Sequence, residues 1–98
     1  MEGPSVVLHP DAVAEAIAAA DWYRERSPAA ANAFCDELDR PITAIASHPM
    51  RWSSYVKGTR RFVLRRFPYS VVYRAGTDRI QVLAIAHARR RPGYWRKR

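Results

Sequence analysis

The sequence has only one cysteine, Cys35, so no disulfide can form within the chain. This scarcity is typical of proteins from a reducing compartment, and we expect a cytoplasmic protein. Long apolar runs are also missing: the longest, alanine-rich residues 16–20, falls far short of the ~18 residues that a membrane helix needs. No signal-peptide pattern opens the sequence. We therefore expect no membrane association, and one domain over residues 1–98.

Metal ligands are equally scarce. The single cysteine and the three histidines, His9, His48 and His87, do not have the spacing of a metal site. We expect no metal and no cofactor. His9 and His48 each precede a proline, which marks them as residues at the boundaries of secondary-structure elements.

Acidic residues are almost absent from the second half of the chain. Residues 1–50 hold three basic and eight acidic residues, a net charge of −5. Residues 51–98 hold fourteen basic residues and a single acid, Asp78, a net charge of +13. A field of that sign attracts anions, which include RNA, DNA and acidic protein segments, and the charge alone does not choose among them.

The pattern of the first residues predicts a short strand and a helix. Residues 5–9 form a β-type run that a proline stops, and the brevity of the run suggests an edge strand or one covered on both faces. The same proline and an early acid suit the first turn of a helix over residues 10–26. The spacing of Val13, Ile17 and Ala20 predicts the apolar stripe of this helix.

A second helix should follow directly, capped by Ser27 and with Pro28 at its first position. The short link predicts an antiparallel α-hairpin. Pro41 lies inside the expected helix, so we predict a kink or break there, with the helix resuming to about Ser47. The apolar face of this helix is expected to carry Phe34, Cys35, Leu38, Ile42 and Ile45.

The sequence pattern of the basic half, residues 51–98, predicts β-strands. Residues 49–59 lack periodicity and are expected to form a loop, whereas residues 60–67, 69–74 and 79–87 alternate or are β-branched and aromatic. Short turns between them favour an antiparallel meander. Residues 88–98 form a basic, aromatic tail that is either mobile or folded back on the domain. The predicted fold class is α+β: a short N-terminal strand, then an antiparallel α-hairpin packed on a three-stranded antiparallel β-meander.

Four local strings, in this order, resemble the RelE/ParE toxin superfamily. They are the Asp-Trp-Tyr of residues 21–23, the second-helix sequences at 33–38 and 46–49, the Arg-Arg-Phe-Pro-Tyr-Ser-Val-Val-Tyr of 65–73, and the last strand and tail at 84–95. The third string is similar to the characteristic Arg-Phe-Pro-Tyr hairpin of the superfamily. The resemblance covers essentially the whole chain, and Pro41 is its one departure.

The resemblance implies the toxin of a type II toxin–antitoxin system, neutralised by a co-encoded antitoxin in a hetero-oligomeric complex. ParE-like members act on DNA gyrase, whereas RelE-like members cut mRNA on the ribosome. The Phe-Pro-Tyr hairpin and the Arg-rich Pro-Gly-Tyr-Trp tail favour the ParE-like branch. An mRNA endonuclease is the alternative, and a basic binding module without toxicity is a third hypothesis.

Cleaving RNA without a metal requires a base, an acid and cations on the phosphate. For that alternative the resemblance and the residue types suggest Arg61 and Arg65 as the cations, and His87 or Tyr94 for proton transfer. Other roles compete with each of these: a solvated sheet edge or the antitoxin-binding surface for the arginines, and a hydrogen-bonded structural role for His87. Tyr94 and Trp95 are alternatively expected to pack together as an aromatic lid. The residues expected to contact the target or the antitoxin are Arg60, Arg66, Arg89, Arg90, Arg91 and Trp95.

Overall fold

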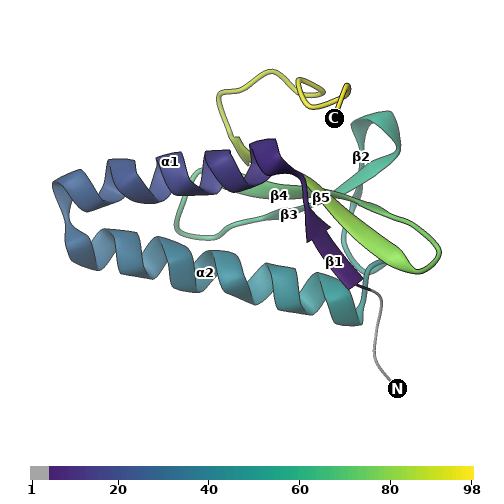
Figure 1. The fold of residues 1–98 in the computed structure, drawn as a ribbon, viewed down its shortest axis with the longest axis horizontal. Helices are drawn as coiled ribbons and strands as arrows, with labels where there is room; N and C mark the ends of the chain where they lie inside the picture. Colours follow the sequence, from purple (N-terminus) through teal and green to yellow (C-terminus); the bar gives the residue numbers. More distant parts are fainter. Residues whose placement is uncertain (1–4) are drawn as a thin grey trace.

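The computed structural model describes residues 5–98, and its elements follow the order strand, two helices, then strands (Figure 1). The predicted first strand and the two helices are confirmed, with bounds close to those expected. The elements are β1 (Ser5–Leu8), α1 (Pro10–Arg26), α2 (Pro28–Ser47), β2 (Ser54–Tyr55), a 3-10 turn (Val56–Gly58), β3 (Thr59–Val63), β4 (Tyr69–Ala75) and β5 (Arg79–His87).

The strands form one mixed sheet in the order β1-β5-β4-β3-β2. The meander β3-β4-β5 is antiparallel, as predicted, and β1 joins it as a parallel edge strand beside β5. The α+β class is therefore confirmed, but the sheet has five strands, whereas the prediction had four, an N-terminal strand and a three-stranded meander. The extra pairing at the other edge comes from β2, inside the segment expected to be a loop. Lys57 and Gly58, both with positive φ, turn the chain so that Tyr55 pairs with Thr59.

Both helices begin at the predicted prolines, Pro10 and Pro28, and each has a side-chain cap. The His9 side chain accepts the backbone N–H of Asp11 at 3.0 Å, and the Ser27 hydroxyl accepts that of Ala30 at 3.2 Å. The predicted break at Pro41 is wrong, because α2 continues through it to Ser47. The proline ring is fully buried, so its packing in the core offsets the lost backbone hydrogen bond.

The buried face of α1 differs from the predicted stripe. Of the predicted stripe only Ala20 is buried, whereas Val13 and Ile17 are 39% and 57% exposed. The helix packs through alanines, and Ala12 and Ala19 are fully or almost fully buried. Small side chains let the helix axis approach the sheet closely, an arrangement that apolar bulk alone does not predict. A consequence is that Glu15 lies on the side of α1 that faces the sheet.

A β-bulge changes the phase of β5. Val72 pairs with Ala84 and Tyr73 with Val82, which leaves Leu83 as the extra residue. Before the bulge Val82 packs with the core under the helices, and after it Ile85 takes that face. Leu83 and Ala84 both face the other side. The strict alternation predicted along this strand therefore ends at Leu83.

Each face of the sheet has its own core. The larger core lies between the sheet and the two helices and includes Phe34, Ile45, Val71 and Tyr73. The smaller one lies on the opposite face and is closed by the tail, whose Trp95 is only 1% exposed. Of the two alternatives for the tail, the structure therefore has the one that folds back, and Figure 1 shows it crossing the end of the sheet.

Candidate functional site

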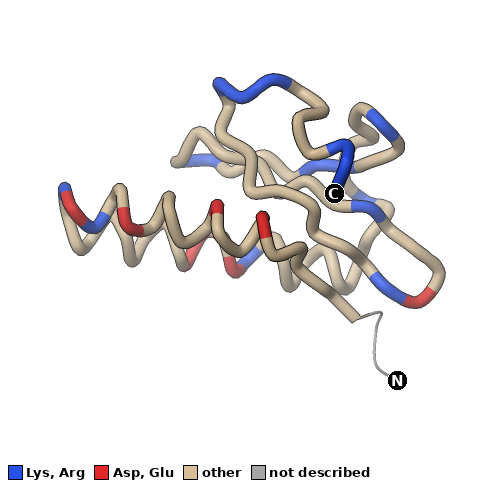
Figure 2. Tube along the Cα trace, turned by 45° about the horizontal axis from the view of Figure 1, so that its top comes forward, with Lys and Arg blue, Asp and Glu red and all other residues tan. Residues whose placement is uncertain are grey.

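Charge is segregated in space as well as in sequence. Figure 2 shows the acidic residues concentrated along the two helices, whereas basic residues follow the sheet, its turns and the tail. The only acid in the basic half, Asp78, lies in the turn between β4 and β5. The folded chain therefore presents a cationic side formed by the strands and the tail, which is suited to a negatively charged partner.

The tail is held in place by one carboxylate on α1. Glu15 accepts two hydrogen bonds from the Arg98 guanidinium, at 2.9 and 3.0 Å, in a bidentate pair. It also accepts the Tyr94 hydroxyl at 2.8 Å and the backbone N–H of Ile85 at 3.0 Å. Arg98 donates in addition to the carbonyl oxygen of Leu83 at the bulge. This cluster, the Glu15 clamp, connects α1, β5 and the tail.

The Glu15 clamp fixes the chemistry of Tyr94. Burial, then the hydrogen bond to the Glu15 carboxylate, raises the pKa of Tyr94 far above its ordinary value. A group that exchanges protons efficiently needs a pKa near the working pH. In this arrangement Tyr94 is a hydrogen-bond donor that positions the tail and is poorly suited to proton transfer.

A second carboxylate, Glu37 on α2, shapes the turn between β3 and β4. It accepts the backbone N–H groups of Arg65 and Arg66 at 2.6 and 3.1 Å and the Arg66 guanidinium at 3.2 Å. Burial raises the pKa of Glu37, but the hydrogen bonds from Arg66 and Arg65 lower it by more, so the net shift is downward.

A Glu37→Gln variant should lose about 1.5–3 kcal/mol of stability at neutral pH, because the neutral amide would not carry the charge that strengthens these hydrogen bonds. A lowered folded-state pKa means that the stabilisation is present above the ordinary glutamate pKa and is lost as the pH falls through the folded-state value. Urea denaturation of both proteins should therefore give curves that differ at pH 7 and converge below pH ~4. A constant difference across that range would contradict this account of Glu37.

The four residues suggested for RNA cleavage lie along three different cavities. Arg61 and His87 line one on the sheet face under the tail, and His87 and Tyr94 line another beside α1. Arg65 lies next to Glu37, in a third cavity between α2 and the β3–β4 turn. His87 accepts the Arg89 backbone N–H at 3.0 Å through Nδ1 and packs edge-on against Tyr69. The arrangement brings these residues together in pairs and not as one set.

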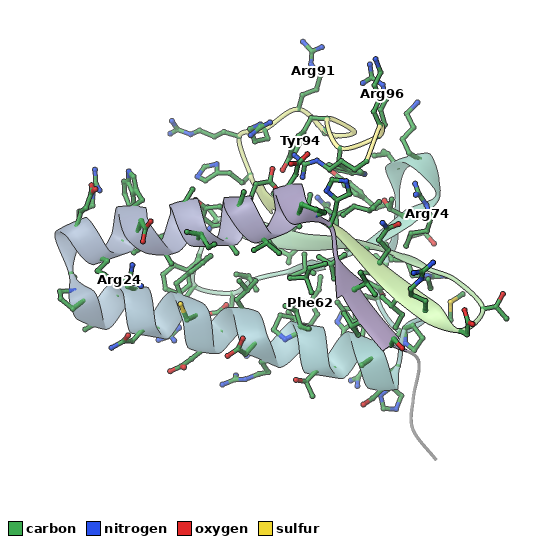
Figure 3. The ribbon with its side chains drawn as sticks, viewed as in Figure 1. Arg24, Phe62, Arg74, Arg91, Tyr94 and Arg96 are labelled. Atoms are coloured by element: carbon green, nitrogen blue, oxygen red, sulfur yellow. The ribbon has the colours of Figure 1, made fainter. Side chains whose placement is uncertain are left out.

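The residues expected to contact a partner divide into exposed and structural ones. Arg89 and Arg91 are exposed on the tail, and Figure 3 shows Arg91 and Arg96 extending from the tail away from the fold. Arg90 is exposed on the tail as well, and Arg66 is exposed although its guanidinium binds Glu37. Arg60 is half-buried and donates to the carbonyl oxygen of Trp52.

Trp95 was expected to contact the target or the antitoxin, and the structure corrects this expectation. Its side chain is buried in the smaller core, so it cannot reach a partner while the tail is folded back. The sequence left open whether Trp95 packs on the domain or contacts a partner; the bulge and the tail together create an apolar pocket that Trp95 fills.

Sequence reasoning also missed Glu15, Glu37 and Arg98. Glu15 is not part of the apolar stripe predicted for its helix, and no local pattern links these residues to their distant partners. The only available signal was that Glu15 is an acid in a chain whose tail is strongly basic.

Two further properties bear on function. None of the helices in residues 5–98 is long and apolar enough to cross a membrane. Over the same residues, no group of three or more histidine, cysteine or acidic side chains is arranged to hold a metal ion.

The helical hairpin packed on a mixed sheet, with a basic tail across it, is the fold that the resemblance to the RelE/ParE superfamily implied. The family model described as the ParE toxin of the type II toxin–antitoxin system parDE matches residues 6–92. The chain belongs to this family.

The fold is similar to that of a solved chain described as the chromosomal ParDE TA system from P. aeruginosa. The TM-score is 0.76 at 23% sequence identity, and the match covers 86% of this chain and 95% of that one. Comparison with curated protein sequences gives no match.

Proposed function

We propose that this ParE-family protein arrests growth by acting on DNA gyrase, and that a co-encoded antitoxin neutralises it. The family match supports the toxin role, and the resemblance to ParE-like toxins suggests gyrase as the target. The single observation that carries the choice of an anionic target is the segregation of basic residues onto the strands and tail. A gyrase engaged with DNA presents such a target, because its substrate carries a dense array of phosphates.

The alternative, an mRNA endonuclease, has weaker support. It needs a proton donor and acceptor poised beside the cations, and Tyr94 is instead bound to the Glu15 carboxylate. Arg65 lies beside Glu37, in a cavity lined by neither Arg61 nor His87. A stoichiometric inhibitor needs no such convergence, so the geometry favours action on a protein–DNA complex.

The test is a plasmid supercoiling assay with purified gyrase. We expect the protein to inhibit supercoiling and to trap cleaved DNA when gyrase and ATP are present. Normal supercoiling with no cleaved DNA at any toxin concentration would contradict the proposal.

A charge-matched pair of double variants tests the role of the tail. Replacing both Arg89 and Arg91 with glutamine should raise the toxin concentration needed for inhibition by about tenfold at low salt, because exposed cations steer association. The difference should shrink as salt is added. Replacing Arg24 and Arg26 in the same way changes the net charge equally on α1 and should have little effect. Equal losses in both variants would mean that net charge alone matters.

For the antitoxin, the helical hairpin offers the apolar surface. Ile17 on α1 is 57% exposed and borders a groove of about 290 Å³ between the helices, which is also lined by Phe34, Cys35 and Leu38. The rim of the groove carries both signs of charge. An amphipathic segment of the antitoxin would bury its apolar side chains in this groove.

An Ile17→Lys variant should weaken antitoxin binding by about tenfold or more, because it places a charge at the apolar groove. The variant should keep its stability, since Ile17 is largely exposed. Val63 on β3 is exposed to the same extent, 57%, and a Val63→Lys variant is the matched control. Calorimetric titration with the purified antitoxin measures both. Unchanged affinity of the Ile17 variant would exclude this groove as the docking site.

A further inference from the structure

A small cavity lies on the face of the sheet opposite the helices, beneath the tail. Its volume is about 160 Å³, and the lining combines β3, β4, the end of β5 and the tail. None of the described residues that line it is acidic. Hydrogen-bond donors instead surround it from several directions. The residues that matter are Arg61, Ser70, His87, Arg90 and Trp95.

Two of these residues are cations held in place without a counter-ion. The Arg61 guanidinium stacks over the Tyr55 ring at 4.1 Å, and that of Arg90 over the Tyr94 ring at 3.9 Å. Among residues 5–98, neither guanidinium has an ion-pair partner. Aromatic stacking orders the planar groups and leaves their N–H donors available, which is the preorganised state that favours anion binding.

Trp95 supplies an independent observation. Its side chain is 1% exposed, and its indole N–H is buried with no acceptor among the described residues. Leaving a buried donor unpaired costs about 1–3 kcal/mol, so native structures rarely keep one without a reason. Here the unpaired donor belongs to a residue that lines a cavity flanked by two free cations.

We propose that this cavity binds a phosphate group. A carboxylate offers two oxygens in a plane, whereas a phosphate presents oxygens in a tetrahedral arrangement and carries more charge. Donors from β3, β4 and the tail approach the cavity from different elements, and this favours the tetrahedral anion. The small volume suits a free phosphate or the terminal phosphate of a nucleic-acid strand. The inference goes beyond the proposed action on gyrase and does not depend on it.

The experiment follows the three tryptophan indole resonances of the full chain in proton–nitrogen correlation spectra. Titration with inorganic phosphate should shift the Trp95 resonance saturably, and more than those of Trp22 and Trp52. A short oligonucleotide is then compared with and without a phosphate on its 5′ end. Tighter binding of the phosphorylated than of the unphosphorylated strand identifies a strand end as the source, whereas equal binding of the two strands identifies the free anion.

Single variants distinguish binding in this cavity from nonspecific attraction by the positive net charge. Arg61→Gln should weaken phosphate binding by about tenfold or more, and so should Arg90→Gln on the exposed tail, which is less prone to disturb folding. Arg79→Gln removes the same charge at the far end of β5 and should leave affinity unchanged. The proposal is overturned if Trp95 does not respond, if all three variants weaken binding equally, or if a glutamate-rich peptide binds through this cavity as tightly as phosphate.

Discussion

Replacing Trp95 with alanine should lower the free energy of unfolding by about 3–5 kcal/mol, because it removes the largest side chain of the smaller core. The melting temperature should fall by more than about 10 °C in a domain of this size. Stacking on Tyr55, with ring centroids 5.5 Å apart, would be lost as well. Thermal unfolding followed by circular dichroism measures the effect.

The matched control is Trp22→Ala, at a side chain that is 51% exposed. Losing the Trp22 side chain should lower the free energy of unfolding by less than about 1 kcal/mol. A Trp95→Phe variant keeps an aromatic ring in the pocket and removes the unpaired N–H, so it should lie between the wild type and the alanine variant. If the two alanine variants had the same melting temperature, the tail would not be part of the folded core.

Glu15→Gln should destabilise the protein by about 2–3 kcal/mol, because the bidentate partner of Arg98 would lose its charge. Both side chains of this pair are mostly buried, with 18% and 15% of their surfaces exposed. The loss should be concentrated in the tail, since the Tyr94 hydroxyl also depends on this carboxylate. Hydrogen exchange should therefore rise first over residues 94–98.

The control for this variant is Glu25→Gln, on the same helix but with a side chain that is 78% exposed. Surface ion pairs contribute little, so its stability should be within about 0.5 kcal/mol of the wild type. Faster exchange spread over the whole sheet in the Glu15 variant, with no preference for the tail, would show that the clamp is not local.

Local signals in the sequence predicted the helices well. His9-Pro10 and Ser27-Pro28 each combine a side-chain acceptor with a proline at the first turn, and both helices begin there. The strands β4 and β5 also lie where β-branched residues and a turn placed them. These features depend on neighbouring residues, so a single sequence is sufficient to predict them.

The features that were missed depend on residues distant in sequence. The bulge at Leu83 arises from the pairing of β4 with β5, and the burial of Trp95 depends on the face that this bulge creates. Pro41 looked like a break because the core that accepts its ring is built from other elements. Glu15 looked like a surface residue because its partners are Ile85, Tyr94 and Arg98.

The candidate site was likewise predicted only in part from the sequence. Charge counting predicted a cationic half, and the fold keeps those residues on the strands and the tail. Counting charges could not show that Arg61 and Arg90 flank one cavity, or that the backbone N–H of Arg65 binds Glu37 elsewhere. These positions depend on the register of β3 and on the path of the tail.

The most direct measurement is made in cells in which this chain is induced alone, with DNA integrity and mRNA 5′ ends followed in the same culture. We predict growth arrest with gyrase-linked cleaved DNA and an unchanged pattern of mRNA ends. Codon-phased mRNA cuts with intact DNA, or growth that continues undisturbed, would contradict the account.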